Sequence, residues 1–192
     1  MAELRVARTE LILGAHNSGK TVRAEMLAAA WLDASPQHRA VYIATAQAWD
    51  DEMRERIAMH QRRRGESVPR METMEEPREL ARAIGLHSRA DTLIVVDCLT
   101  LWLTAQLMPA AGEGADAVGA GVPHDAIAAA LRACAGPIIL ISNEVAPDSF
   151  ALGHDARTFI DALGGLNREA AVACERVTLM SAGEPLLLKG AS

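Results

Sequence analysis

One stretch near the start of the chain has the residue types and spacing of a phosphate-binding loop. It is a complete GxxxxGK[ST] pattern that directly follows the apolar run 11–13, and it reads Gly14-Ala15-His16-Asn17-Ser18-Gly19-Lys20-Thr21. Its glycines let the backbone curl, so that N–H groups point into one nest that a phosphate fills. Lys20 offers a positive charge to the outer phosphates, and Thr21 offers a hydroxyl to Mg²⁺. The pattern predicts binding of a nucleoside triphosphate rather than a chance match in a glycine-containing turn.

A carboxylate stands where such a loop needs one. Asp97 closes the continuous apolar run 92–96, so it lies at the end of a predicted strand. A carboxylate at a strand end beside a phosphate loop can organise Mg²⁺ together with Thr21. The alternative is a helix N-cap for the segment that starts at Leu99, and one residue can serve both purposes.

A histidine in a charged helical segment is a further candidate. Met53, Ile57 and His60 are spaced i, i+4, i+7, so the imidazole shares a helix face with two apolar side chains. That spacing alone favours a partly buried structural histidine. A neutral imidazole is also a nucleophile near pH 7, and the neighbouring arginines at 62–64 can neutralise a triphosphate. Both interpretations stay open. His16, inside the phosphate loop, is expected to have an incidental role.

Alternating strands and helices must position these residues. The pattern predicts an α/β fold like that of P-loop NTPases, with a mostly parallel sheet, helices on both faces and a C-terminal hairpin, in a single domain spanning 1–192. We expect the phosphate loop, Thr45, Asp97 and the turn at 142–144 to meet at the carboxyl edge of this sheet. The predicted strands are 11–13, 40–45, 92–97, 137–142, 177–181 and 185–189; the helices are 19–31, 49–64, 76–86, 99–107, 124–134 and 155–173; the loops include 65–73, 110–123 and 143–154.

Composition narrows the class of protein. A net charge of −6 and an aromatic content of 3% argue against a nucleic-acid partner. The sequence contains no apolar run of the roughly 18 residues that a membrane helix requires. Its three cysteines are widely spaced, so we expect small buried side chains in a reducing cytoplasm rather than disulfides. These features predict a soluble, cytoplasmic protein.

Several motifs together resemble the bifunctional adenosylcobinamide kinase and adenosylcobinamide-phosphate guanylyltransferase family of cobalamin biosynthesis. The resemblance spans most of the chain, and its most specific blocks are YIATAQ at 42–47 and DDEM at 50–53 leading to HQRRR at 60–64. The other blocks are the phosphate loop, TMEEP at 73–77, VDCLT at 96–100, SNEV at 142–145 and LNR at 166–168. The segment 146–153 departs from the glycine-rich stretch that is usual in the family.

The resemblance implies two reactions. A nucleoside triphosphate, ATP or GTP, phosphorylates the hydroxyl of the aminopropanol arm of adenosylcobinamide, and GMP from GTP is then joined to that phosphate. The guanylylated histidine of the family falls on His60, and Lys20, the loop amides and Mg²⁺ stabilise developing charge. The resemblance also implies nucleotide contacts from Thr45, Gln47 and Arg62 and a ribose contact from Glu75.

Two other functions compete with this interpretation. One is a monofunctional small-molecule P-loop kinase in which His60 is structural, and the other is a nucleotide-dependent regulatory binding module. The resemblance further implies a corrinoid substrate and a homo-oligomer, possibly a trimer. The lack of a long apolar run argues against a membrane partner.

Overall fold

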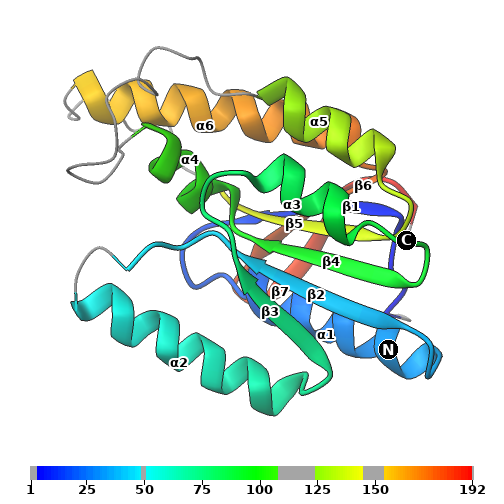
Figure 1. Cartoon of the computed structure of the whole chain (residues 1–192). Helices are drawn as coiled ribbons and strands as arrows, with labels where there is room; N and C mark the ends of the chain where they lie inside the picture. The colour runs from blue at the N-terminus through cyan, green and yellow to red at the C-terminus, as the bar shows by residue number, and fades with distance from the viewer. Residues whose placement is uncertain (1–3, 49–50, 108–123, 145–153, 192) are drawn as a thin grey trace.

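A seven-stranded sheet forms the centre of the computed structural model, which describes residues 4–48, 51–107, 124–144 and 154–191 (Figure 1). The strand order is β3-β2-β4-β5-β1-β6-β7, and every pair is parallel except β6 and β7. The strands are β1 (Thr9–Gly14), β2 (Arg39–Ala44), β3 (Met71–Glu75), β4 (Thr92–Asp97), β5 (Ile138–Asn143), β6 (Arg176–Ser181) and β7 (Glu184–Lys189). The predicted parallel sheet and C-terminal hairpin are therefore confirmed.

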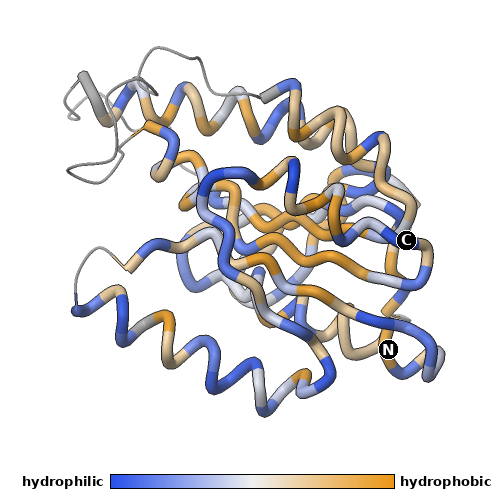
Figure 2. The backbone as a smooth tube through the Cα atoms, viewed as in Figure 1, coloured by the Kyte–Doolittle hydropathy of each residue, from blue (hydrophilic) through white to orange (hydrophobic). Residues whose placement is uncertain are grey.

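Helices cover both faces of the sheet. One face packs against α3 (Leu80–His87), α4 (Leu99–Leu107), α5 (His124–Ala133) and α6 (His154–Ala173), and the other side carries α1 (Lys20–Ala34) and α2 (Asp51–Ser67) (Figure 1). Successive strand residues point to opposite faces, so Leu11 and Leu13 join the core under α6 while Ile12 joins the core under α1. Figure 2 shows the apolar strands between these layers. Burial of the central strands on both faces explains their continuous apolar sequences.

The predicted loop over 65–73 is wrong. Helix α2 continues to Ser67, and β3 starts at Met71 and pairs with β2 from Ala40↔Met71 to Ala44↔Glu75. β3 is an outer strand whose residues Glu72, Thr73 and Glu75 are exposed. Its sequence therefore lacks the apolar run that identifies the buried strands. Hydrogen bonding to β2, rather than its own sequence, makes this segment a strand.

The remaining elements agree with the sequence to within a few residues. Helix α3 begins at Leu80 instead of 76, because the Glu76 carboxylate accepts the N–H groups of Arg78 and Glu79 in a turn before the helix. The predicted connection at 110–123 and most of the loop at 143–154 lie outside the described residues. All three cysteines are free and buried, as expected, and no described helix is both long and apolar enough to span a membrane.

Candidate functional site

The loop after β1 has the backbone conformation that its glycines permit. Gly14 has φ +153° and Gly19 has φ +98°, values that L side chains rarely adopt. A Cβ placed on Gly14 would lie 2.5 Å from Ser18 Oγ and 2.6 Å from the Met180 carbonyl oxygen. A larger residue at Gly14 would therefore displace the loop at the point where β1 ends.

Lys20 folds back over this loop. Its Nζ donates to the carbonyl oxygens of Gly14 at 2.8 Å and Ala15 at 2.6 Å, and only 7% of the residue is exposed. Burial lowers the pKa of Lys20, while the nearby Cys98 and Asp97 oppose this shift. The ammonium thus lies against the mouth of the loop, held by carbonyl oxygens that a phosphate can replace.

Asp97 is the point where the phosphate loop meets the sheet edge. Its Oδ2 accepts one hydrogen bond from Thr21 Oγ1 at 2.9 Å and another from the Tyr42 hydroxyl at 2.5 Å. Burial, followed by the charge and hydrogen bond of Asp97, raises the pKa of Tyr42 well above its usual value. The structure therefore brings together Thr21 and Asp97, as the sequence predicts. It adds Tyr42, which opens the YIATAQ block at 42–47 but to which the sequence assigns no role.

Thr45 holds the chain next to this carboxylate. Its Oγ1 donates to the Cys98 carbonyl oxygen at 2.7 Å and accepts the Cys98 N–H at 2.8 Å, and the residue is fully buried. The Thr45 N–H donates to the carbonyl oxygen of Asp97 at 3.1 Å. The side chain of Thr45 thus ties the end of β2 to the chain that follows Asp97.

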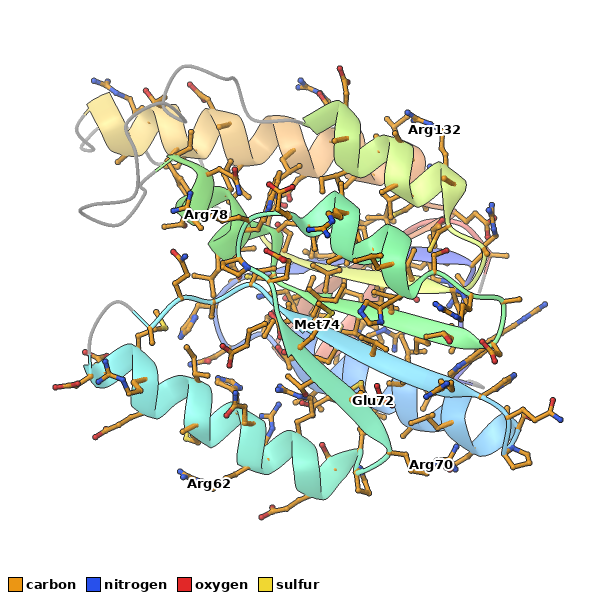
Figure 3. All side chains as sticks on the ribbon, in the orientation of Figure 1. Arg62, Arg70, Glu72, Met74, Arg78 and Arg132 are labelled. Atoms are coloured by element: carbon orange, nitrogen blue, oxygen red, sulfur yellow. The ribbon has the colours of Figure 1, made fainter. Side chains whose placement is uncertain are left out.

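Helix α2 carries His60 and connects to the site through the arginines that follow it. The Arg64 guanidinium lies 3.7 Å from the centre of the Tyr42 ring, and Arg63 pairs with the buried Glu25 of α1 at 3.3 Å. His60 is partly buried and lies one helical turn before Arg64, so the two share a helix face. Arg62 is exposed and points away from the sheet (Figure 3).

A cavity of about 400 Å³ lies between α2 and the ends of β2 and β3, and we call it the α2 cavity. Gln61 Nε2 donates to Glu75 Oε1 at 3.2 Å across it. Gln47 Oε1 is buried and has no hydrogen-bond partner among the described residues. Two of the predicted nucleotide contacts, Gln47 and Glu75, are therefore brought together next to the helix of His60. The lining includes Gln47, Arg54, Ile57, Gln61, Glu75 and Pro77.

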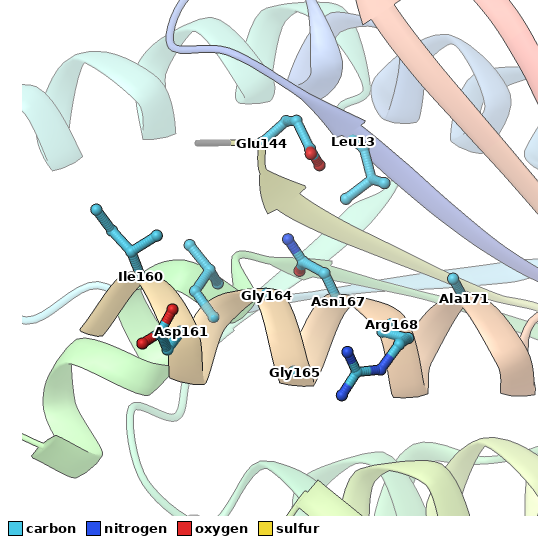
Figure 4. A pocket seen from close by; sticks show the side chains of 10 residues that line it. Leu13, Glu144, Ile160, Asp161, Gly164, Gly165, Asn167, Arg168 and Ala171 are labelled. Atoms are coloured by element: carbon cyan, nitrogen blue, oxygen red, sulfur yellow. The ribbon is translucent and has the colours of Figure 1, made fainter. Parts of the chain in front are cut away.

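A second cavity, of about 490 Å³, lies on the other side of the phosphate loop, between the ends of β1 and β5 and the side of α6 (Figure 4). We call it the α6 cavity. It is joined to the loop by the Glu144 N–H, which donates to the Gly14 carbonyl oxygen at 3.0 Å. Sequence reasoning noted LNR at 166–168 only as a family block, because nothing in it signals a cavity. The lining includes Leu13, Glu144, Ile160, Gly164, Asn167 and Ala171.

The donor set at Asp97 fits Mg²⁺. In the part of the chain that the structure describes, no three His, Cys, Asp or Glu residues group as a metal site. Mg²⁺ needs few protein ligands, because it keeps waters and takes oxygens from substrate phosphates. The facing oxygens of Thr21 and Asp97 meet that requirement.

Comparison with known proteins shows a family match over most of the chain. The family model described as cobinamide kinase / cobinamide phosphate guanyltransferase matches residues 10–188. The bifunctional adenosylcobalamin biosynthesis protein CobP of Pseudomonas aeruginosa is 41% identical over 182 residues, which cover 94% of this chain and 97% of the relative. The corresponding CobU proteins of Escherichia coli and Salmonella typhimurium are 29% and 30% identical, covering 93% of this chain and 98% of each relative. Among solved structures, the flagellar accessory protein FlaH of Methanocaldococcus jannaschii covers 96% of this chain and 79% of its own, with a TM-score of 0.47 and 13% identity.

Proposed function

This chain belongs to the cobinamide kinase / cobinamide phosphate guanyltransferase family, and on that premise we propose how its residues divide the two reactions. The enzyme is bifunctional and acts in adenosylcobalamin biosynthesis. We assign the kinase step to the phosphate loop and Asp97, and the guanylyl transfer to His60 on α2. The observation that carries this assignment is the contact between the two parts, in which Arg64 of α2 stacks on the tyrosine that holds Asp97.

In the kinase step, the hydroxyl oxygen of the adenosylcobinamide arm attacks the γ-phosphorus of ATP or GTP. The bond from the γ-phosphorus to the bridging oxygen breaks, the nucleoside diphosphate leaves and the hydroxyl proton is released. The N–H groups of the loop hold the phosphates. Lys20 exchanges the carbonyl oxygens of Gly14 and Ala15 for phosphate oxygens, and the phosphate charge favours its protonated form.

Thr21 and Asp97 are the residues that would hold Mg²⁺. A bound Mg²⁺ ion supplies positive charge next to the transferring phosphoryl group. The Tyr42 hydroxyl donates to the same oxygen of Asp97 as Thr21 does, and this bond restrains the orientation of the carboxylate before nucleotide binds. Thr45 restrains the backbone that follows Asp97 in the same way.

In the guanylyl transfer, a neutral His60 nitrogen attacks the α-phosphorus of GTP and pyrophosphate leaves. An oxygen of adenosylcobinamide phosphate then attacks the same phosphorus, the P–N bond breaks and the imidazole is restored. Support comes from the position of His60 next to Gln61 and one turn from Ile57, both of which line the α2 cavity. The amides of Gln47 and Gln61 and the carboxylate of Glu75 offer the mixed donors and acceptors that a guanosine requires.

Because different residues are assigned to the two reactions, substitutions should abolish one activity and leave the other. A His60→Ala variant should phosphorylate cobinamide at near the wild-type rate and form no cobinamide-GDP. A Lys20→Ala variant should lose phosphorylation, because the charge on the outer phosphates is no longer neutralised. Both products can be followed with γ-labelled and α-labelled GTP in one chromatographic assay. Guanylyl transfer that persists in His60→Ala would refute the proposed relay and leave a kinase whose histidine is structural.

We also propose that the enzyme works in the cytoplasm, where both nucleotides are available, and as a homo-oligomer, possibly a trimer. The outer strand β7 supports self-association, because Leu186 and Leu188 are 57% and 54% exposed on it. Sedimentation velocity would test the assembly. A Leu188→Glu variant should weaken it, and a monomeric wild-type protein would refute it.

A further inference from the structure

The α6 cavity has no role in the reactions as assigned so far. It opens at the carboxyl edge of β1 and β5, next to the carbonyl oxygen of Gly14, to which Lys20 also donates. Ligands of parallel sheets bind at this edge. The nucleotide residues lie elsewhere, on the loop, on α1 and around the α2 cavity. The α6 cavity is therefore placed for the molecule that receives the γ-phosphoryl group.

A buried side-chain amide in this cavity has one acceptor atom without a partner among the described residues. Asn167 extends from α6 toward Glu144 and Leu13 (Figure 4), and 8% of the residue is exposed. Its Nδ2 donates to the carbonyl oxygen of Asn143 at 3.0 Å. Because a carbonyl can only accept, that bond fixes the amide orientation and leaves Oδ1 as an acceptor. Oδ1 has no hydrogen-bond partner among the described residues, so it is ready to receive an N–H or O–H group.

The charges around the cavity favour a neutral ligand that donates hydrogen bonds. Two carboxylates, Glu144 and Asp161, line it against one guanidinium, Arg168. The apolar part of the cavity wall is formed by Leu13, Ile160 and other small or aliphatic residues. A phosphate would be repelled by the two carboxylates. A short carbon chain that carries an amide and a hydroxyl can instead donate hydrogen bonds to acceptor oxygens and pack against the apolar walls.

We propose that the α6 cavity binds the aminopropanol arm of cobinamide, with Asn167 Oδ1 accepting the N–H of the arm's amide and Glu144 accepting its hydroxyl. This proposal rests on the kinase function proposed above. A volume of about 490 Å³ accommodates one arm and leaves the corrin ring outside. The hydroxyl then lies on the phosphate-loop side of the cavity, because Glu144 is bonded to Gly14.

A glycine in the cavity wall allows a direct test. Ile160, Gly164, Asn167 and Ala171 follow one stripe of α6, and a Cβ added to Gly164 meets nothing within 4 Å. A Gly164→Leu change therefore fills the cavity without a backbone clash and improves helix propensity. Gly85 of α3 is the matched control, because it is also helical, exposed and free of neighbours within 4 Å of an added Cβ.

The readout is the affinity for cobinamide, measured by calorimetry with a non-hydrolysable ATP analogue present. Gly164→Leu should weaken binding about tenfold or more, and Asn167→Ala about fivefold to tenfold, whereas Gly85→Leu should match the wild type. A cobinamide analogue methylated on the arm's amide nitrogen should bind the wild type and Asn167→Ala equally weakly. That equality identifies the Oδ1 contact, because a general loss of structure would weaken both ligands in the variant.

Labelling of the protein by α-labelled GTP needs no corrinoid, so it separates the two proposals. Gly164→Leu should label as well as the wild type. Unchanged cobinamide affinity in Gly164→Leu, or a loss of its GTP labelling while Gly85→Leu labels normally, would overturn the acceptor assignment. If GTP does not label the wild-type protein, the proposed guanylyl transfer through His60 is refuted. The binding of the arm in the α6 cavity is then judged by the cobinamide affinities alone.

Discussion

The hydrogen bond between Tyr42 and Asp97 can be tested with unusual clarity, because Tyr42 is the only tyrosine in the chain. Its hydroxyl donates to Asp97 Oδ2 at 2.5 Å, and 4% of the residue is exposed. Replacing it with Phe removes this bond and keeps the ring on which Arg64 stacks. A hydrogen bond to a charged group contributes about 1.5–3 kcal/mol to stability. Because the partly exposed Asp97 can bond to water in the variant, we expect Tyr42→Phe to lower the free energy of unfolding by about 1.5 kcal/mol. For a chain of this size that corresponds to a Tm about 3–6 °C lower.

The pH dependence provides a second, independent measure. Because the folded pKa of Tyr42 is raised above the unfolded value, its stabilising contribution is complete below the unfolded pKa near 10 and decreases as pH rises toward the folded pKa. The stability difference between wild type and Tyr42→Phe should therefore shrink above about pH 10. Measuring this difference, rather than the wild type alone, removes the contribution of every other group that titrates in that range.

Ultraviolet absorbance of the phenolate gives the direct assay. In the folded protein the phenolate should form only well above the pH at which it forms in denaturant. An Asp97→Asn variant should titrate between these two limits, because burial is the largest cause of the shift and the Asp97 charge is a further one. A folded wild-type protein whose tyrosine titrates as it does in denaturant would refute the buried contact with Asp97.

Three further substitutions probe the same edge of the sheet. Gly14→Ala should abolish nucleotide binding in equilibrium dialysis while the protein still folds, because its Cβ would lie 2.5 Å from Ser18 Oγ; tight binding would contradict the loop geometry. Lys20→Ala should bind ATP at least about tenfold more weakly and lose most kinase turnover, since a charge-assisted contact is removed; unchanged kinetics would contradict its role. Thr45→Val should lower the free energy of urea unfolding by about 2–4 kcal/mol, because it leaves the buried Cys98 N–H without a partner and removes one of the two bonds to the Cys98 carbonyl oxygen, which keeps the Trp102 N–H; an unaltered midpoint would contradict that contact.

The parts of the fold that follow from local sequence were predictable. The strands around β4 are continuous apolar runs because the sheet is covered on both faces, and the phosphate loop has a pattern that few other structures require. Asp97 was located by its position at a strand end, and the structure places it within hydrogen-bond distance of Thr21.

The parts that depend on tertiary pairing were not predictable. β3 carries exposed Glu72, Thr73 and Glu75, so only its pairing with β2 identifies it as a strand. Tyr42 looks like an ordinary strand residue, and its contact with Asp97 spans 55 positions of the chain. The α6 cavity arises where α6 passes the ends of β1 and β5, and no local pattern encodes that empty space.

The central claim is that the same phosphate loop holds the triphosphate for two separate reactions, transfer of the γ-phosphoryl group in the first and attack on the α-phosphorus of a second nucleotide, GTP, in the other, with His60 receiving the GMP. Peptide mapping by mass spectrometry after incubation with GTP alone tests this most directly. We predict a single guanylyl adduct on the peptide of α2, located on His60, stable to base and lost when cobinamide phosphate is added. An adduct on another residue, or no adduct while cobinamide-GDP still forms from GTP and cobinamide phosphate, would contradict the account.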